Sequence, residues 1–221
     1  MGPSVGREIE QIREQVIKMA TLVEEAVAAS IDSLLSSDTE KAQTVIANDG
    51  RINTLEMAID QAIFETLALK APVASDLRFL FSVQKMDKDL ERIGDHAVNI
   101  AQAAVNCISY DFKVKITPLE TMFTLTKGML SDAITSFVND DSQLALKVME
   151  LDDQVDDLNK VMSREVIKLV KQDVNSAEVW LEMLRVSKNL ERIADLSTNI
   201  AEDVIFHAKA TDVKHHHIEN H

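Results

Sequence analysis

Apolar residues along most of this chain recur at alternating spacings of three and four, which predicts one face of an α-helix. The clearest run lies between residues 74 and 108: Phe79, Val83, Met86, Leu90, Ile93, Ala97, Ile100 and Ala104. A second run lies between residues 177 and 209: Val179, Met183, Val186, Leu190, Ile193, Ser197, Ile200 and Val204. Seams that keep this spacing are typical of long helices that pack as in a coiled coil.

Turn and capping residues divide the chain into six predicted helices. Ser37 and Glu40 form a capping-box pattern, Pro72 interrupts a helix, and Thr117-Pro118 supplies an N-cap followed by proline at the first helical position. The expected helices cover about residues 7–35, 40–70, 74–108, 118–137, 142–172 and 177–209. The link at 110–117 is the expected boundary between two halves.

Short turns between long helices predict antiparallel neighbours, and the composition agrees with an all-helical chain. The 221 residues include only 5 Gly and 3 Pro, 4% are aromatic and 27% are charged. We therefore expect an all-α fold of two tandem, similar antiparallel three-helix bundles, placed either end to end or side by side. Residues 1–112 would form the first bundle and residues 113–221 the second.

The stretch at residues 87–101 is repeated at residues 187–201, and the repeat keeps polar as well as apolar positions. A helical core explains the matching Leu and Ile residues. It does not explain the shared polar file of Glu-x-x-x-Asp-x-x-x-Asn, which is Glu91, Asp95 and Asn99 in one copy and Glu191, Asp195 and Asn199 in the other. We expect the function to lie in this file.

Each polar file has an acidic partner on the preceding helix. Residues equidistant from the turn of an antiparallel hairpin lie at the same level. The pairs 49/95 and 53/91 are both centred on position 72, and the pairs 152/195 and 156/191 are both centred on 173.5. Each hairpin therefore brings a four-residue polar set to one level: Asp49, Asn53, Glu91 and Asp95, and Asp152, Asp156, Glu191 and Asp195.

Converging carboxylates repel one another, and a multivalent cation would relieve that repulsion. Counting 100° per residue places Glu91 and Asp95 beside and behind the seam, on an outward or lateral surface. An all-oxygen set suits Mg²⁺, Mn²⁺, Ca²⁺ or iron. His96 could add a nitrogen ligand in the first half only, since Leu196 stands at the matching position. The alternative is that these acidic residues are ordinary solvated surface.

Composition also restricts partners and compartment. The net charge of −14 argues against binding a nucleic-acid backbone and against attraction to anionic lipid. No apolar run approaches the roughly 20 residues that cross a bilayer, and the N-terminus lacks an apolar signal core. The single cysteine, Cys107, fits a reducing cytosol. We expect a cytoplasmic protein without direct membrane insertion. His215, His216 and His217 are a metal site, a purification remnant or a frayed tail.

At these residues the chain resembles the PhoU family of regulators of bacterial phosphate uptake. The resemblance rests on Ala74-Ser75-Asp76-Leu77-Arg78, on Leu90-Glu91-Arg92-Ile93-Gly94-Asp95, and on residues 190–195 with Asn199-Ile200. It implies a six-helix protein, often a homodimer, that binds metal clusters on its surface and is not an enzyme. It further implies a negative regulator of the phosphate-starvation response, which connects the ATPase subunit of the phosphate ABC transporter to a sensor histidine kinase at the inner face of the membrane.

The resemblance also assigns metal ligands by motif: Asp49, Glu91, Asp95, Asp152, Asp156, Glu191 and Asp195. The metal would be iron, manganese, magnesium or zinc, in a divalent or trivalent state. Asn53 stands where Asp156 has a carboxylate, so equal loading of the two sites is not expected.

Two other functions remain as alternatives. The first is a carboxylate-bridged iron-storage or di-iron bundle, although such sites usually use inward-facing Glu and Glu-x-x-His, a motif that this chain lacks. The second is a purely structural coiled-coil module. The sequence has no Gly-rich phosphate loop, nucleophile elbow or His-Glu-x-x-His motif.

Overall fold

The computed structural model describes residues 5–110 and 116–209, and nearly all of them are helical. The helices are α1 (Gly6–Ser36), α2 (Thr39–Lys70), α3 (Ala74–Ser109), α4 (Thr117–Val138), α5 (Ser142–Met149), α6 (Asp152–Gln172) and α7 (Ala177–Lys209), and a short 3-10 helix, η1 (Val174–Ser176), precedes α7. The described residues contain no strand, which confirms the expected all-α class.

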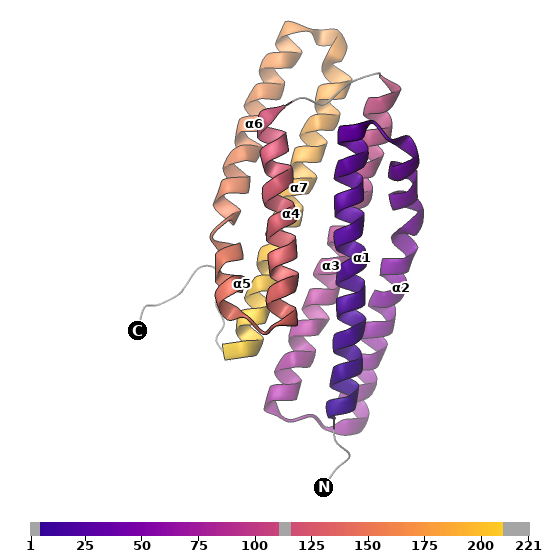
Figure 1. Ribbon diagram of the computed structural model, residues 1–221, viewed down its shortest axis with the longest axis vertical. Coiled ribbons are helices and arrows are strands. Elements are labelled where there is room, and N and C mark those ends of the chain that lie inside the picture. The colour runs from indigo at the N-terminus through magenta and orange to yellow at the C-terminus, as the bar shows by residue number, and fades with distance from the viewer. Residues whose placement is uncertain (1–4, 111–115, 210–221) are drawn as a thin grey trace.

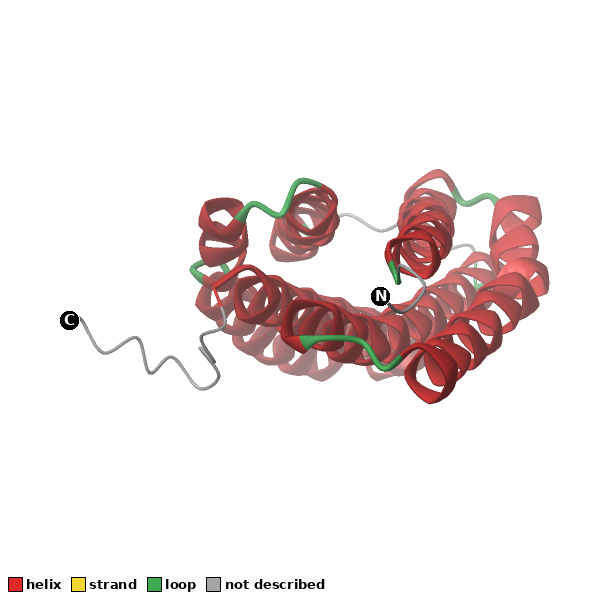
Figure 2. Cartoon of the chain, turned by 90° about the horizontal axis from the view of Figure 1, so that it is seen from below, coloured by secondary structure: helices red, strands yellow, loops and turns green. Residues whose placement is uncertain are grey.

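Helices α1–α3 and helices α4–α7 form two similar antiparallel bundles that lie side by side (Figure 1). The central helices α3 and α7 pack against each other, and α2 and α6 flank them to complete one curved layer (Figure 2). Helix α1 packs on α2 and α3, and α4 packs on α5, α6 and α7, both on the concave side of that layer. Of the two arrangements that the sequence left open, the structure adopts the side-by-side one.

The two central helices run antiparallel. The Ser82 hydroxyl donates to the carbonyl oxygen of Asp203 at 3.2 Å, and the Asn106 amide donates to the Glu182 carboxylate at 2.8 Å. Early residues of α3 therefore meet late residues of α7. As a result, the α2–α3 turn and the α6–α7 turn lie at opposite ends of the molecule (Figure 1).

Both apolar seams predicted from the sequence are buried. Leu90, Ile93, Leu190 and Ile193 are all 0% exposed. Each such side chain contributes about 1.5–3 kcal/mol to stability through its removal from water. Cys107 is also buried, and burial raises the pKa of its thiol to about 12.

Three local predictions were wrong, and the first concerns α4, whose N-cap is Ile116 and not Thr117 and makes no side-chain capping hydrogen bond. The N-cap of α2 is Asp38, whose carboxylate accepts from the Lys41 backbone N–H at 2.9 Å, whereas Ser37 ends α1 in the left-handed region. The helix expected over 142–172 is interrupted at Glu150 and Leu151, where the Leu151 N–H bonds to the Val148 carbonyl and tightens the turn. Acidic residues then open α6, where they interact favourably with the positive end of the helix dipole.

A cation–π cluster joins α1, α3 and α4 at the end of the molecule near the α2–α3 turn. The Arg13 guanidinium lies 4.9 Å from the ring centroid of Phe79 and 5.3 Å from that of Phe137. The His207 ring of α7 meets Phe79 edge-on at 5.3 Å, and burial lowers the pKa of this histidine. These contacts tie the two bundles together beyond the α3–α7 seam.

Candidate metal centres

The second hairpin brings three carboxylates together between α6 and α7. Asp156, Glu191 and Asp195 each offer an oxygen, and these oxygens all lie within 4.8 Å of one another. Asp156 and Asp195 are partly exposed, whereas Glu191 is only 9% exposed. The outward or lateral placement expected for Glu91 and Asp95 therefore does not extend to Glu191 at the matching position, because α6 packs on this side of α7.

Burial and mutual repulsion dominate the electrostatics of this set. The pKa of Asp195 is raised to about 6, first by burial and then by the charges of Glu191 and Asp152. Asp152 lies in the first turn of α6 and accepts from the Thr198 hydroxyl at 3.4 Å. All four residues that the sequence placed at one level are thus electrostatic neighbours, as the spacing from the turn predicted.

Two basic residues offset part of this negative charge. The Lys188 ammonium lies 2.5 Å from one Glu191 oxygen, and the Arg192 guanidinium lies 3.0 Å from an Asp195 oxygen. The second Glu191 oxygen, Oε2, is buried, accepts no hydrogen bond from the described residues, and lies 3.7 Å from Arg192 Nε. A cation could satisfy this oxygen more fully than the distant guanidinium does.

The first hairpin holds a looser version of the same set. The pKa of Asp49 is raised by burial and then by Asp95, and the pKa of Glu91 is raised by burial and then by Asp95, so these three residues are electrostatic neighbours. Asn53 donates to Asp49 at 3.3 Å, and Oδ1 of each side chain is buried and makes no hydrogen bond with the residues that the structure describes. Over residues 5–110 and 116–209, three carboxylates come within 4.8 Å of one another only in the second hairpin.

The amide at position 53 explains part of this difference between the hairpins. Asn53 uses its own donor to hold the Asp49 carboxylate, whereas Asp156 at the matching place carries no donor. His96 does not join the set: its Nδ1 lies 2.8 Å from the Asn189 amide oxygen across the α3–α7 interface, and burial lowers the pKa of the ring. Asn99, expected to continue the polar file, accepts from Arg185 of α7 at 3.2 Å.

Sequence reasoning missed two buried aspartates of α3. Asp87 is 0% exposed and Asp89 is 8% exposed. A signal was available, since Asp87 lies four residues after Val83 and three before Leu90, on the seam itself. Burial raises the pKa of Asp89 and the neighbouring Arg92 charge lowers it. Burial is the larger effect, and the pKa is raised to about 6.

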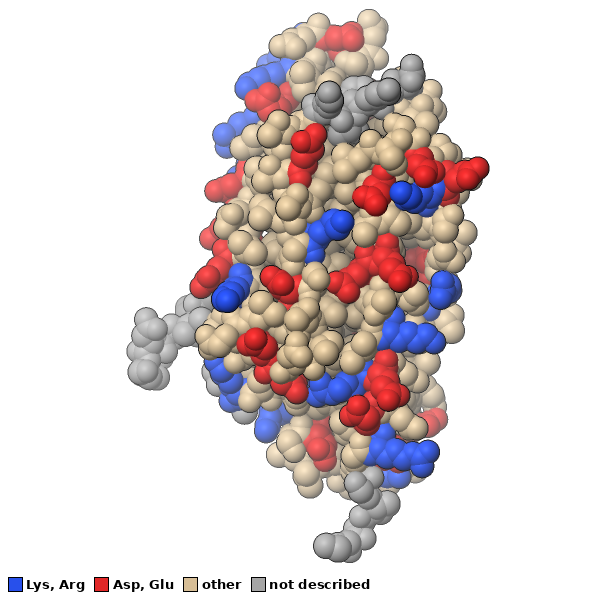
Figure 3. Space-filling view, viewed as in Figure 1, with Lys and Arg blue, Asp and Glu red and all other residues tan. Residues whose placement is uncertain are grey.

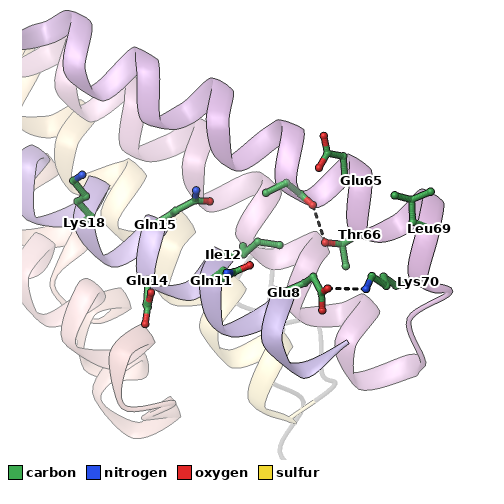
Figure 4. Close-up of a pocket in the computed structure, with 11 residues that line it drawn as sticks. Glu8, Gln11, Ile12, Glu14, Gln15, Lys18, Glu65, Thr66, Leu69 and Lys70 are labelled. Carbon is green, nitrogen blue, oxygen red and sulfur yellow. Dashed lines mark hydrogen bonds and ion pairs between the residues drawn. The ribbon is translucent and has the colours of Figure 1, made fainter. Parts of the chain in front are cut away.

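The other charged regions described below contribute no ligands to the two carboxylate sets. An open groove between α1 and α2 is bounded by an ion pair of 2.7 Å between Glu8 and Lys70 (Figure 4). Acidic and basic side chains are interspersed over the face that displays α1, α2 and α4 (Figure 3). The candidate ligands His215, His216 and His217 lie outside the described residues.

The residues present fit a metal ion. Both hairpins supply several carboxylate oxygens. Among the residues that the structure describes, one buried oxygen in each hairpin accepts no hydrogen bond: Asp49 Oδ1 in the first and Glu191 Oε2, which lies 3.7 Å from Arg192 Nε, in the second. Oxygen-rich sets of this kind suit hard cations such as Mg²⁺ or Mn²⁺, and also iron. When bound, the ion would neutralise the carboxylate repulsion that, after burial, raises the pKa of Asp195.

Comparison with known proteins shows a consistent relationship along the chain. The family model of the PhoU domain matches residues 16–104 and again residues 119–204. The chain is 37% identical over 213 residues to the phosphate-specific transport system accessory protein PhoU homolog of Aquifex aeolicus, and the match covers 96% of each protein. It is 34% identical to the homolog of Pseudomonas putida, over 94% of this chain and 82% of the relative.

Solved structures give the same result. The crystal structure of PhoU from Pseudomonas aeruginosa superposes with a TM-score of 0.91 at 32% identity, over 94% of this chain and 100% of that one. The phosphate transport system regulatory protein PhoU from Streptococcus pneumoniae superposes with a TM-score of 0.87 at 30% identity, over 95% and 99%. These relatives are named as accessory or regulatory proteins, in agreement with the expectation of a non-enzymatic protein. The chain belongs to the PhoU family.

Proposed function

We propose that this protein is a regulatory accessory subunit of a phosphate transport system, and that it represses phosphate uptake and the phosphate-starvation response. The observation that carries the proposal is the relationship over nearly the whole chain to relatives named as phosphate-specific transport system accessory proteins. The duplicated carboxylate sets support the proposal, because a non-enzymatic adaptor could use them to bind metal.

The proposed partners are the ATPase subunit of the phosphate ABC transporter and a sensor histidine kinase, with the protein acting as a homodimer. None of the helices in residues 5–110 and 116–209 combines the length and apolar character of a membrane span. In this proposal, protein partners recruit the chain to the inner face of the membrane. A long, side-by-side pair of bundles offers two similar faces for such contacts.

Metal binding would stabilise the adaptor. Asp152, Asp156, Glu191 and Asp195 would hold one ion or cluster, and Asp49, Glu91 and Asp95 would hold another more weakly, because Asn53 replaces a carboxylate. The di-iron alternative has less support, since it usually requires Glu-x-x-His and the chain contains none.

A complementation assay tests the regulatory role. A bacterial strain that lacks its own PhoU family protein and carries a phosphate-starvation reporter would receive this chain, or an Asp95→Asn/Asp195→Asn variant. We expect the wild-type chain to repress the reporter at high phosphate and the variant to repress it less. Unchanged reporter activity with a folded, well-expressed wild-type chain would contradict the proposal. Equal repression by both chains would show that the regulatory role does not require the Asp95 and Asp195 carboxylates.

A further inference from the structure

A cavity of about 210 Å³ lies between α1 and α2, with residues of α3 at its base. Its walls are mainly apolar and include Leu22 and Ala26 of α1, Val45 and Ile52 of α2, and Gly94 and Val98 of α3. Protein interiors are close-packed, so a space of this size between packed helices calls for an explanation. A concave, mostly apolar pocket with a few polar groups at its mouth is the usual form of a small-molecule site.

The second bundle places larger apolar side chains at the corresponding positions. The buried residues of α1 recur in α4 at the same intervals, as in the pairs Val16/Leu119, Val27/Leu130 and Leu34/Phe137. In this register Ala26 corresponds to Met129, which is 0% exposed and belongs to the core. Asn48, at the mouth of the cavity, corresponds to Leu151, which packs against the core. The cavity therefore depends on the first bundle's own sequence, and the fold does not require it.

Two opposite charges lie on either side of the mouth of the cavity. Glu25 lines it from α1 and Arg51 lines it from α2, at similar distances from the α1–α2 turn. Both residues are exposed, and neither side chain forms an ion pair or a hydrogen bond with a residue that the structure describes. The matching residues of the second bundle, Gly128 and Gln154, carry no charge. The pair of charges thus accompanies the cavity and is not repeated in the bundle where methionine replaces Ala26.

A carboxylate opposite a guanidinium is complementary to a zwitterionic head group. An ammonium group would pair with Glu25, and a carboxylate would pair with the planar Arg51 guanidinium, which can bind it through two parallel hydrogen bonds. Lys41, Thr44 and Asn48 line the cavity from the same helix as Arg51 and add donors for the carboxylate. A simple cation or anion would match only one of the two charges.

We propose that this cavity binds a free α-amino acid with an apolar side chain, which enters beside Ala26 while the ammonium and carboxylate groups pair with Glu25 and Arg51. A cavity of about 150 Å³ accommodates a molecule of the size of benzene, so this one has room for a branched aliphatic, thioether or phenyl group. Burial of that group would supply most of the affinity, and the two ion pairs would fix its orientation. The proposal goes beyond the regulatory function proposed above. It depends neither on that function nor on metal at Asp49, which also lines the cavity.

Isothermal titration calorimetry of the full chain in EDTA tests the proposal, with L-leucine, L-methionine and L-phenylalanine as probes. We expect the tightest-binding of the three to bind with single-site stoichiometry. Its N-acetyl derivative, which lacks the ammonium, and its decarboxylated amine, which lacks the carboxylate, should each bind about tenfold more weakly, because each loses a hydrogen bond to a charged group. Glycine, which lacks the apolar group, should not bind measurably.

Four variants locate the site. Ala26→Met places the second bundle's residue in the cavity, so it should abolish binding and melt at the same temperature as wild type or higher. Ala47→Met, the same change at an exposed position of α2 outside the cavity, should bind as wild type does. Glu25→Gln and Arg51→Gln alter exposed side chains, and each should weaken binding of the amino acid about tenfold. Arg51→Gln should leave binding of the decarboxylated amine unchanged.

Three results would overturn the proposal. The first is no binding of any of the three amino acids to the wild-type chain. The second is wild-type affinity in Ala26→Met, or in both Glu25→Gln and Arg51→Gln. The third is equal affinity for the amino acid and its decarboxylated amine, which would show a site for an apolar amine instead. If Ala26→Met fails to fold, the two variants at the mouth of the cavity decide the question.

Discussion

Replacement of Asp195 by asparagine should stabilise the metal-free protein and destabilise the metal-loaded one. The pKa of Asp195 is raised from an ordinary 3.8 to about 6, which corresponds to about 3 kcal/mol of unfavourable interaction when the group is charged. The side chain is 33% exposed, so solvent screening reduces this to about 1–2 kcal/mol. This figure already includes the favourable charge of Arg192, so loss of that ion pair is not subtracted again.

The expected net gain for Asp195→Asn without metal is about 1–2 kcal/mol at pH 7.5, or about 2–8 °C in melting temperature for a chain of this size. The size of this gain depends on pH. Because the folded-state pKa is raised, the destabilisation is complete above about pH 6 and disappears as the pH falls toward 3.8. The advantage of the variant should therefore vanish near pH 4.

Thermal unfolding in EDTA and in excess Mn²⁺, at several pH values, measures these effects. Metal should raise the melting temperature of wild type more than that of the variant, since a ligand that binds only the folded state stabilises it. Arg192→Gln, which removes the pairing cation and keeps the carboxylate, serves as the control and should be destabilised in EDTA. A metal-free Asp195→Asn protein that is less stable than wild type at pH 7.5 would refute the reasoning.

Three further substitutions test the packing by urea denaturation. Ile93→Ala should cost about 2–5 kcal/mol, because it leaves a cavity in the α3 seam, and a cost below 1 kcal/mol would contradict that packing. Arg13→Ala should cost about 1–2 kcal/mol through loss of its contact with the Phe79 ring, whereas an unchanged midpoint would show that the contact adds nothing. Gly94→Ala should be neutral within about 1 kcal/mol, because better helix propensity offsets a Cβ contact of 3.0 Å with Ile52; a loss above 2 kcal/mol would show that Ile52 cannot move.

The sequence predicted the helices well because apolar spacing and turn residues agreed. Every seam position of α3 and α7 is buried, and Pro72 lies in the α2–α3 turn as expected. The break at Glu150 could not be foreseen, since no Gly or Pro marks it and the apolar spacing continues through it. Competition between Ser37 and Asp38 for one N-cap is likewise decided by backbone geometry.

The sequence predicted which residues of the candidate site lie at the same height along each hairpin, but it did not predict how deeply each residue is buried. Distance from the turn correctly placed Asp156 beside Glu191, because an antiparallel hairpin fixes that pairing. Helical-wheel angles placed Glu91 and Asp95 beside and behind the seam, but such angles take no account of the neighbouring helix that covers Glu191 at the matching position. The sequence also gave no means of knowing that His96 faces Asn189, since that contact depends on how the two bundles pack.

Metal content tests the central claim most directly. Inductively coupled plasma mass spectrometry would be applied to purified protein and to the Asp95→Asn/Asp195→Asn variant, prepared side by side. The account predicts stoichiometric metal in the wild-type protein that is lost or strongly reduced in the variant, and the spectrum would identify the ion. An absence of metal from both proteins, with identical melting temperatures with and without added metal, would contradict the account and would leave the carboxylate sets as a surface for a protein partner.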